Sequence, residues 1–200
     1  MCLIKICGCT CPLNAQSCAA LGADFIGVLC SSKSPRFVSQ ERAAEITQAV
    51  RKENKEVVLV FVDEEQEFIL GYLETSGAKA VQLHGENGLR QAPFLPSDVM
   101  QIHIHDLKPS LLMSQVEAFA DCFLLDRSPG KGPTCEWKDL ELPQNKQIML
   151  AGGLNKKNIR EFVRQKQAYA IDLCSGLEGP TKGIKDLELV REFIDIVRAG

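Results

Sequence analysis

Short apolar runs rich in β-branched residues alternate with longer amphipathic stretches along the whole 200-residue chain. A short apolar run is typical of a buried strand, whereas apolar positions that recur every three to four residues indicate a helix packed on one face. The runs predict strands at Leu3–Cys7, Phe25–Leu29, Val57–Val62, Ala80–Leu83, Met100–His105, Cys122–Asp126, Ile148–Ala151 and Ala170–Cys174. The stretches between them predict helices at Leu13–Leu21, Gln40–Lys52, Glu64–Thr75, Asn155–Gln165 and Lys185–Ala199.

This alternating order predicts an α/β fold, a compact (β/α)8 TIM barrel, and we expect one domain over residues 1–200. An open doubly wound sheet is the structural rival, but it would more often contain fewer strands. The chain is short for a barrel, which typically needs about 250 residues. Pro93, Pro96 and Pro109 predict short or irregular helices near them, and the glycine- and proline-rich segment after Asp126 predicts a loop.

Composition narrows the possible partners. Apolar residues make up 45% of the chain, enough for a sizeable core, and the formal net charge of -3 gives no reason to expect nucleic acid. We expect no membrane association, because no apolar run is long enough to span a bilayer and the N-terminus does not resemble a secretory signal. The nine cysteines then indicate reduced thiols and a cytoplasmic protein.

Glycines follow the last two predicted strands and predict a phosphate site. Loops after strands 7 and 8 of barrels commonly bind phosphate through backbone N–H groups, and glycine lets the backbone approach an anion closely. Gly152 and Gly153 follow the seventh predicted strand, and Ser175 and Gly176 follow the eighth. We therefore expect a small phosphorylated molecule as substrate.

Other chemically active residues stand where predicted strands end, and barrel active sites lie at that carboxyl-terminal face. Cys7 and Asp126 end the first and sixth strands, and His84 follows the fourth. A thiol acts as a general base only as thiolate, so Cys7 would need a lowered pKa. The ammonium of Lys5 could lower it by stabilising the negative charge of the thiolate. Arg36, in the loop after the second strand, could clamp a carboxylate through two parallel hydrogen bonds.

Two groups of potential metal ligands stand in the sequence, and neither has the pattern of a metal site. Cys7, Cys9 and Cys11 form a C-x-C-x-C run, which lacks the C-x2-C pair and second cluster of a zinc site. His103 and His105 would share one face of the fifth strand, and we expect them to be polar residues of the barrel interior, with Ile102 and Ile104 packed against helices. We expect no metal and no cofactor.

Eight segments, in order over nearly the whole chain, resemble the phosphoribosylanthranilate isomerase family of tryptophan biosynthesis. They are Lys5-Ile6-Cys7-Gly8, Gly22-Ala23-Asp24 leading to Gly27, Ser34-Pro35-Arg36-Phe37-Val38, Val81-Gln82-Leu83-His84-Gly85, Leu125-Asp126, Leu150-Ala151-Gly152-Gly153-Leu154-Asn155, Asp172 with Ser175-Gly176 and Glu178, and Gly183-Ile184-Lys185-Asp186. The resemblance implies an Amadori rearrangement of N-(5′-phosphoribosyl)anthranilate, without cofactor, in a monomer or homodimer.

The resemblance also implies roles for individual residues. Asp126 is expected to protonate the furanose ring oxygen, and Cys7 to remove the proton at C2′ of the opened sugar. Arg36 is expected to hold the anthranilate carboxylate, with His84 also at the substrate and Asp172 near the sugar hydroxyls. The chain departs from the family in the loop 129–137, and at Cys174, where the family commonly has serine; the backbone N–H of Cys174 can still bind phosphate.

Two alternatives remain compatible with the sequence. The sister isomerase of histidine biosynthesis performs the same rearrangement on a larger substrate, but it would show an aspartate at the end of strand 1 and two similar half-barrels. A non-catalytic phosphosugar-binding barrel would explain the altered loop 129–137, although Cys7, Asp126 and Arg36 are all retained.

Overall fold

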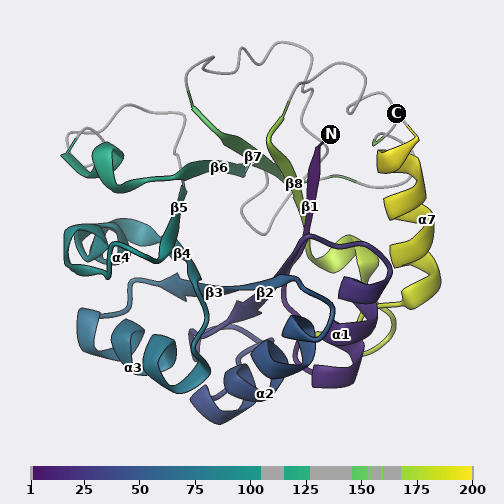
Figure 1. Ribbon diagram of the computed structural model, residues 1–200, viewed down its shortest axis with the longest axis horizontal. Helices are drawn as coiled ribbons and strands as arrows, with labels where there is room; N and C mark the ends of the chain where they lie inside the picture. The colour runs from purple at the N-terminus through teal and green to yellow at the C-terminus, as the bar shows by residue number, and fades with distance from the viewer. Residues whose placement is uncertain are drawn as a thin grey trace.

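Eight parallel strands close into a barrel in sequence order in the computed structural model, with β1 hydrogen-bonded to β8 (Figure 1). The structure describes residues 2–104, 115–126, 146–152, 154, 159 and 168–199. The strands are β1 Leu3–Ile6, β2 Phe25–Leu29, β3 Glu56–Val62, β4 Ala80–His84, β5 Met100–Ile104, β6 Cys122–Asp126, β7 Ile148–Ala151 and β8 Ala170–Leu173. The predicted TIM barrel and all eight predicted strands are confirmed.

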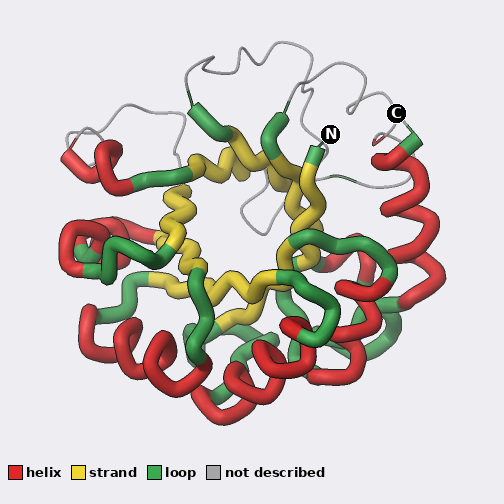
Figure 2. The backbone as a smooth tube through the Cα atoms, in the orientation of Figure 1, coloured by secondary structure: helices red, strands yellow, loops and turns green. Residues whose placement is uncertain are grey.

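The described helices lie outside the ring of strands, at the left, bottom and right of the view in Figure 2. They are α1 Pro12–Ala20, α2 Gln40–Arg51, α3 Gln66–Ser76, α4 Gly85–Arg90, α7 Leu187–Arg198 and the 3-10 turns η1 Ala92–Phe94, η2 Glu117–Phe119 and η4 Ser175–Leu177. The short α4 and η1 confirm the irregular helix expected around Pro93. The loop 129–137 and the irregular helix expected near Pro109 fall outside the described residues, as does the expected helix 155–165 apart from residue 159. In the described part of the chain, no helix is long and apolar enough to cross a membrane.

Side-chain caps set where two of the helices begin. The Ser39 hydroxyl accepts a hydrogen bond from the backbone N–H of Arg42, which fixes the start of α2 where the sequence predicted it. The Asp186 carboxylate accepts from the N–H groups of Glu188 and Leu189. Because Asp186 takes the cap position, α7 begins after it and not at Lys185, as the apolar pattern had suggested.

Two separate layers of buried side chains flank the strands, one inside the barrel and one between strands and helices. The expected position of His103 is wrong. Ile102 and Ile104 belong to the interior layer, whereas His103 is fully buried on the outer side, edge-to-face with Phe123. Successive side chains of a strand alternate between faces, so His103 and Ile102 cannot share one. His105 is outside the described residues.

Candidate active site

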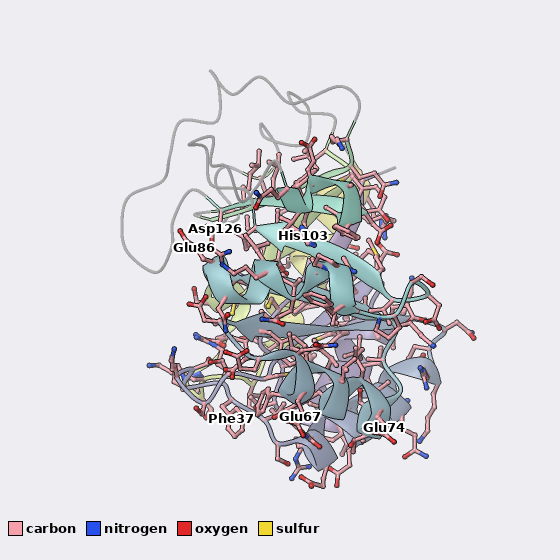
Figure 3. The ribbon with its side chains drawn as sticks, turned by 90° about the vertical axis from the view of Figure 1, so that its left-hand side faces the viewer. Phe37, Glu67, Glu74, Glu86, His103 and Asp126 are labelled. Atoms are coloured by element: carbon pink, nitrogen blue, oxygen red, sulfur yellow. The ribbon has the colours of Figure 1, made fainter. Side chains whose placement is uncertain are left out.

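The interior layer is apolar towards the start of the strands and polar towards their carboxyl ends. The polar end of this layer is formed by side chains that alternate along the chain with residues of the outer layer: Lys5 of β1 and Cys7 directly after it, Gln82 and His84 of β4, Asp126 of β6 and Asp172 of β8. In the side view of Figure 3, Asp126 lies towards the same end of the barrel as Phe37 of the loop after β2, and Glu74 near the end of α3 lies towards the other. The predicted site residues within the described ranges therefore meet at one face, and Gly153 is outside those ranges.

A buried ion pair joins β1 to β8 beneath this face. The Nζ atom of Lys5 donates to Oδ2 of Asp172 at 3.0 Å, and Lys5 also hydrogen-bonds Cys7. Burial alone would lower the pKa of Lys5, but the charge of Asp172 and the neighbouring Cys7 outweigh it, so the pKa is raised and the ammonium stays charged. Burial raises the pKa of Asp172, and the charge of Lys5 opposes this rise. The charge of Asp126 raises the pKa of Asp172 further.

Cys7 occupies a space that only glycine neighbours permit. A Cβ atom on Gly27 would lie 2.6 Å from Cys7 Sγ and 2.9 Å from Cys7 Cα, so any other residue in the middle of β2 would displace the thiol or the backbone of β1. The backbone N–H of Cys7 donates to the carbonyl of Leu173 at 2.7 Å, which places Cys7 beside the end of β8. The thiol is therefore held from both neighbouring strands.

Cys7 shares a hydrogen bond with the thiol of Cys174, the residue that follows β8. This bond, and then burial, raises the pKa of Cys7, while Lys5 opposes the shift. The same hydrogen bond, with Lys185 and Arg36 nearby, lowers the pKa of Cys174 to about 7. The expectation of a lowered pKa at Cys7 itself is thus wrong: the more acidic member of the thiol pair is Cys174, and the apparent pKa belongs to the pair.

Arg36 is fixed by a carboxylate of the chain itself. Its Nε and Nη2 atoms donate to the two carboxylate oxygens of Glu178 at 2.5 and 2.6 Å. Burial would raise the pKa of Glu178, but the hydrogen bonds from Arg36 and from the N–H of Gly183 outweigh it and lower the pKa to about 2. A Cβ on Gly8 would lie 2.7 Å from Arg36 Cδ and 2.9 Å from Cys174 Sγ, so Arg36 passes directly beside the thiol pair.

Lys185 adds a further buried cation between the Cys7–Cys174 thiol pair and the Arg36–Glu178 ion pair. Its Nζ atom donates to the carbonyl of Cys174 at 2.9 Å and lies 3.3 Å from Glu178 Oε1, with the side chain fully buried. Three cationic side chains, those of Lys5, Arg36 and Lys185, thus lie in this part of the face. These cations suit a phosphate or carboxylate ligand.

Gln82 and His84 project into the barrel from β4. The Nε2 atoms of the two side chains are hydrogen-bonded. Burial and then Lys5 lower the pKa of His84 to about 4, so the imidazole is neutral near pH 7 and its Nε2 can accept from the Gln82 amide. The amide oxygen of Gln82, Oε1, takes no part in this bond. Among the buried side-chain atoms of the described residues, Gln82 Oε1 and Asp172 Oδ1 are acceptors without a hydrogen-bond partner.

The two halves of the predicted phosphate site lie side by side. Gly152, directly after β7, has φ +94°, a conformation that favours glycine. A Cβ on Gly176 in η4 would lie 3.3 Å from the carbonyl oxygen of Leu154, so the segments that follow β7 and β8 touch. Ser175 and Gly176 start η4 next to Cys174, which brings the phosphate candidates to the same corner as Lys185.

The cysteine run does not gather around an ion. The Cys9 thiol donates to the carbonyl of Ile6 and lies in the outer layer with Cys18 of α1, whereas Cys7 belongs to the interior layer. Within the described ranges, no three His, Cys, Asp or Glu side chains come together as a metal site.

Gln82, Glu178 and Lys185 belong to segments that carry the family resemblance, but sequence reasoning gave them no role. Gln82 could have been found by its spacing, since it lies two residues before His84 and therefore on the same face of β4. Glu178 gave no such signal, because its partner Arg36 lies in the loop after β2, far away in the sequence. Lys185 bonds Cys174 and Glu178 across an irregular segment, where no strand or helix spacing indicates the contact.

The chain is similar to known proteins over nearly its whole length. Residues 4–196 match the family described as N-(5′phosphoribosyl)anthranilate (PRA) isomerase. The N-(5′-phosphoribosyl)anthranilate isomerase of Chlamydia caviae is 35% identical over 96% of this chain and 94% of its own length. The crystal structure of phosphoribosyl anthranilate isomerase from Thermotoga maritima superposes with a TM-score of 0.85 at 30% identity, covering 100% of both chains.

A further solved structure shows phosphoribosyl anthranilate isomerase in complex with reduced 1-(o-carboxyphenylamino)-1-deoxyribulose 5-phosphate. It has a TM-score of 0.83 and 29% identity, again over 100% of both chains. The family profile spans nearly the whole barrel, and the similarity to these relatives extends from end to end. The chain therefore belongs to the N-(5′-phosphoribosyl)anthranilate isomerase family, and it is an isomerase.

Proposed function

We propose that the enzyme converts N-(5′-phosphoribosyl)anthranilate into 1-(2-carboxyphenylamino)-1-deoxyribulose 5-phosphate in tryptophan biosynthesis, with Cys7 as general base and Asp126 as general acid. The observation that carries this assignment is that a thiol directly after β1 and a carboxylate at the end of β6 lie at the same face of the parallel barrel, above the buried Lys5–Asp172 pair. An isomerisation that moves protons between neighbouring carbons and a ring oxygen needs one acid and one base in separate environments.

The reaction would begin with ring opening. Asp126 gives its proton to the furanose oxygen, the C1′–O bond breaks, and the anthranilate nitrogen forms a Schiff base with C1′. Cys7 then removes the proton from C2′, and the electron pair of that C–H bond neutralises the Schiff base to an enolamine. The enolamine tautomerises to the ketone, so the substrate is isomerised without any external oxidant or reductant.

The thiol pair supplies the base in this scheme. Since Cys7 and Cys174 share a hydrogen bond, loss of one proton near pH 7 leaves a single proton between two sulfur atoms. Lys5 lies beside Cys7 and stabilises negative charge on that sulfur. We assign the proton transfer to Cys7 because it projects into the barrel beside Lys5.

The substrate would be held by the remaining polar groups of the interior. Arg36 has five N–H donors, of which Glu178 engages two, and the others would bind the anthranilate carboxylate. The unpartnered acceptors Asp172 Oδ1 and Gln82 Oε1 would receive hydrogen bonds from sugar hydroxyls. His84 contributes by holding the Gln82 amide in that orientation.

The phosphate would be bound by backbone N–H groups of Gly152, Gly153, Cys174, Ser175 and Gly176, as loops after strands 7 and 8 do in other barrels. The charge of Lys185 next to Cys174 supports an anion there. No cofactor takes part in the proposed reaction. We further propose a cytoplasmic monomer or homodimer, and light scattering of the purified protein decides between the two.

Two measurements on the purified protein test this function: the loss of substrate fluorescence with product analysis, and calorimetric binding of the reduced product analogue. Conversion of the substrate together with binding of the analogue would support the proposal. Binding without conversion would identify a non-catalytic phosphosugar-binding barrel. If the protein neither bound the analogue nor converted the substrate, this result would contradict the assignment of both the substrate and the site.

A further inference from the structure

Cys7 and Cys174 occupy matching positions at the ends of two neighbouring strands. Ile6 of β1 pairs with Leu173 of β8, and the next residue on each strand is a cysteine. Neighbouring strands lie about 4.8 Å apart. A disulfide requires Cα atoms about 4.4–6.8 Å apart, so the backbone already has the spacing of a disulfide. Both side chains belong to the interior layer of the barrel, so the two thiols project to the same side of these neighbouring strands.

The surroundings favour reaction at this pair. Cys174 is partly exposed and Cys7 is 6% exposed at the open end of the barrel. Lys5, Arg36 and Lys185 place positive charge around the two sulfur atoms, which promotes the thiolate form that reacts with oxidants.

A second pair of thiols, Cys9 and Cys18, provides the contrast. Cys9 and Cys18 are both fully buried between β1 and the helices. Close approach of two thiols is common to the pairs, but only Cys7 and Cys174 combine it with access from the active-site face.

We propose that Cys7 and Cys174 are a modification site, at which a hydroperoxide forms a disulfide that reversibly blocks the enzyme. The formation of the bond follows from the position of the two thiols alone, whereas the block rests on the proposed role of Cys7.

The chemistry consumes one peroxide and two thiols. The Cys174 thiolate attacks one peroxide oxygen, the O–O bond breaks, and the departing hydroxide takes a proton to give water, leaving a sulfenic acid on Cys174. Cys7, having lost its proton, attacks that sulfur; the S–S bond forms, the S–O bond breaks, and the second hydroxide leaves as water. The two thiols lose two electrons and two protons in total, and hydrogen peroxide is reduced to two molecules of water.

The disulfide would remove the base without opening the barrel. The sulfur atom of Cys7 is bonded to Cys174 and can no longer accept the C2′ proton, while the hydrogen bonding of β1 to β8 is retained. A dithiol reductant restores both thiols. Without Cys174, peroxide would carry Cys7 on to a sulfinic acid, which dithiols do not reverse.

Peptide mapping after peroxide treatment tests the proposal. The protein is exposed to hydrogen peroxide, its remaining thiols are alkylated in denaturant, and it is digested with trypsin without reduction. Trypsin leaves Cys174 alone on Gln167–Lys182, whereas the Ile6–Lys33 peptide carries Cys7, Cys9, Cys11, Cys18 and Cys30. Fragmentation of the linked peptides is therefore needed to assign the bond to Cys7, and the link should be absent from Cys7→Ser.

The expected result is a linked Cys7–Cys174 peptide, an activity loss of about tenfold or more relative to the untreated protein, and recovery with dithiothreitol. Cys174→Ser should lose its own starting activity without recovery. Cys18→Ala, which removes the other thiol pair, should form the link and recover as the wild type does.

Three results would overturn the proposal: alkylated, unlinked Cys7 and Cys174 after the activity has fallen, a link confined to Cys9 and Cys18, or a linked pair with unchanged activity. A protein without isomerase activity before treatment would refute the proposed function instead. The mapping would still decide whether the disulfide forms.

Discussion

Lys5 Nζ lies 3.0 Å from Asp172 Oδ2 and also hydrogen-bonds Cys7, so one buried ammonium joins the carboxylate of β8 to the proposed base. Since the lysine side chain is fully buried, its charge depends on this partner.

Asp172→Asn is expected to lower the free energy of unfolding by about 3–5 kcal/mol, because the Lys5 charge is left buried without its counter-ion. Urea denaturation measures the change. Asp98→Asn serves as the matched control, since the Lys79–Asp98 ion pair is exposed on both sides and should leave the unfolding transition in place. Equal changes of the unfolding free energy in the two variants would contradict a stabilising role of the buried Lys5–Asp172 pair.

Gln82→Met is expected to lower kcat/KM about three- to tenfold, since the variant loses one neutral hydrogen bond to a sugar hydroxyl. Steady-state kinetics measures the effect. Gln101→Met is the corresponding change on β5, where the amide donates to the carbonyl of Ala92 in the outer layer and cannot reach the substrate. If both variants kept wild-type kcat/KM, Gln82 would have no part in binding.

Gly27→Ala is expected to impair both folding and turnover. The added methyl group would meet the backbone and the thiol of Cys7, which costs about 1–3 kcal/mol of stability as overpacking and moves the base. Thermal unfolding and kcat/KM measured on the same preparation separate the two effects. Gly179→Ala is the control, because no atom lies within 4 Å of a Cβ placed there. A Gly27→Ala protein with normal activity would place the base elsewhere.

The pH dependence of kcat/KM is expected to rise with pH through about 7. The proposed base must be deprotonated, and the first proton leaves the Cys7–Cys174 pair near the value to which the pKa of Cys174 is lowered. In Cys174→Ser the rise should move to higher pH, because Cys7 must then ionise alone in a buried position. His84, whose pKa is lowered to about 4, should add no inflection above pH 5. An unshifted profile in Cys174→Ser would exclude the coupling of the two thiols.

The order of strands could be predicted from the sequence because every strand of a barrel is buried on both faces and therefore forms an apolar run. The same property explains the error at His103. When both faces are buried, alternating residues do not reveal which set faces the interior, and only pairing with the neighbouring strands decides it. Strand ends gave the candidate site in the same way, since parallel strands bring their carboxyl ends together.

Contacts across the closure of the barrel could not be predicted. Cys7 and Cys174 lie at opposite ends of the chain, as do Lys5 and Asp172, and they become neighbours only because β1 pairs with β8. The shift of acidity from Cys7 to Cys174 depends on that pairing. For the same reason, the bond between Arg36 and Glu178 has no local signal in the sequence.

The most direct test of the account is kcat/KM of Cys7→Ser and Asp126→Asn, measured beside the wild type by the loss of substrate fluorescence. We expect both variants to fold and each to lose about a hundredfold or more in kcat/KM, since each lacks one of the two groups that transfer protons. Cys122→Ala, a change in the apolar interior of β6, is the control and should retain most of the activity. Wild-type kcat/KM in either Cys7→Ser or Asp126→Asn would contradict the assignment of base and acid.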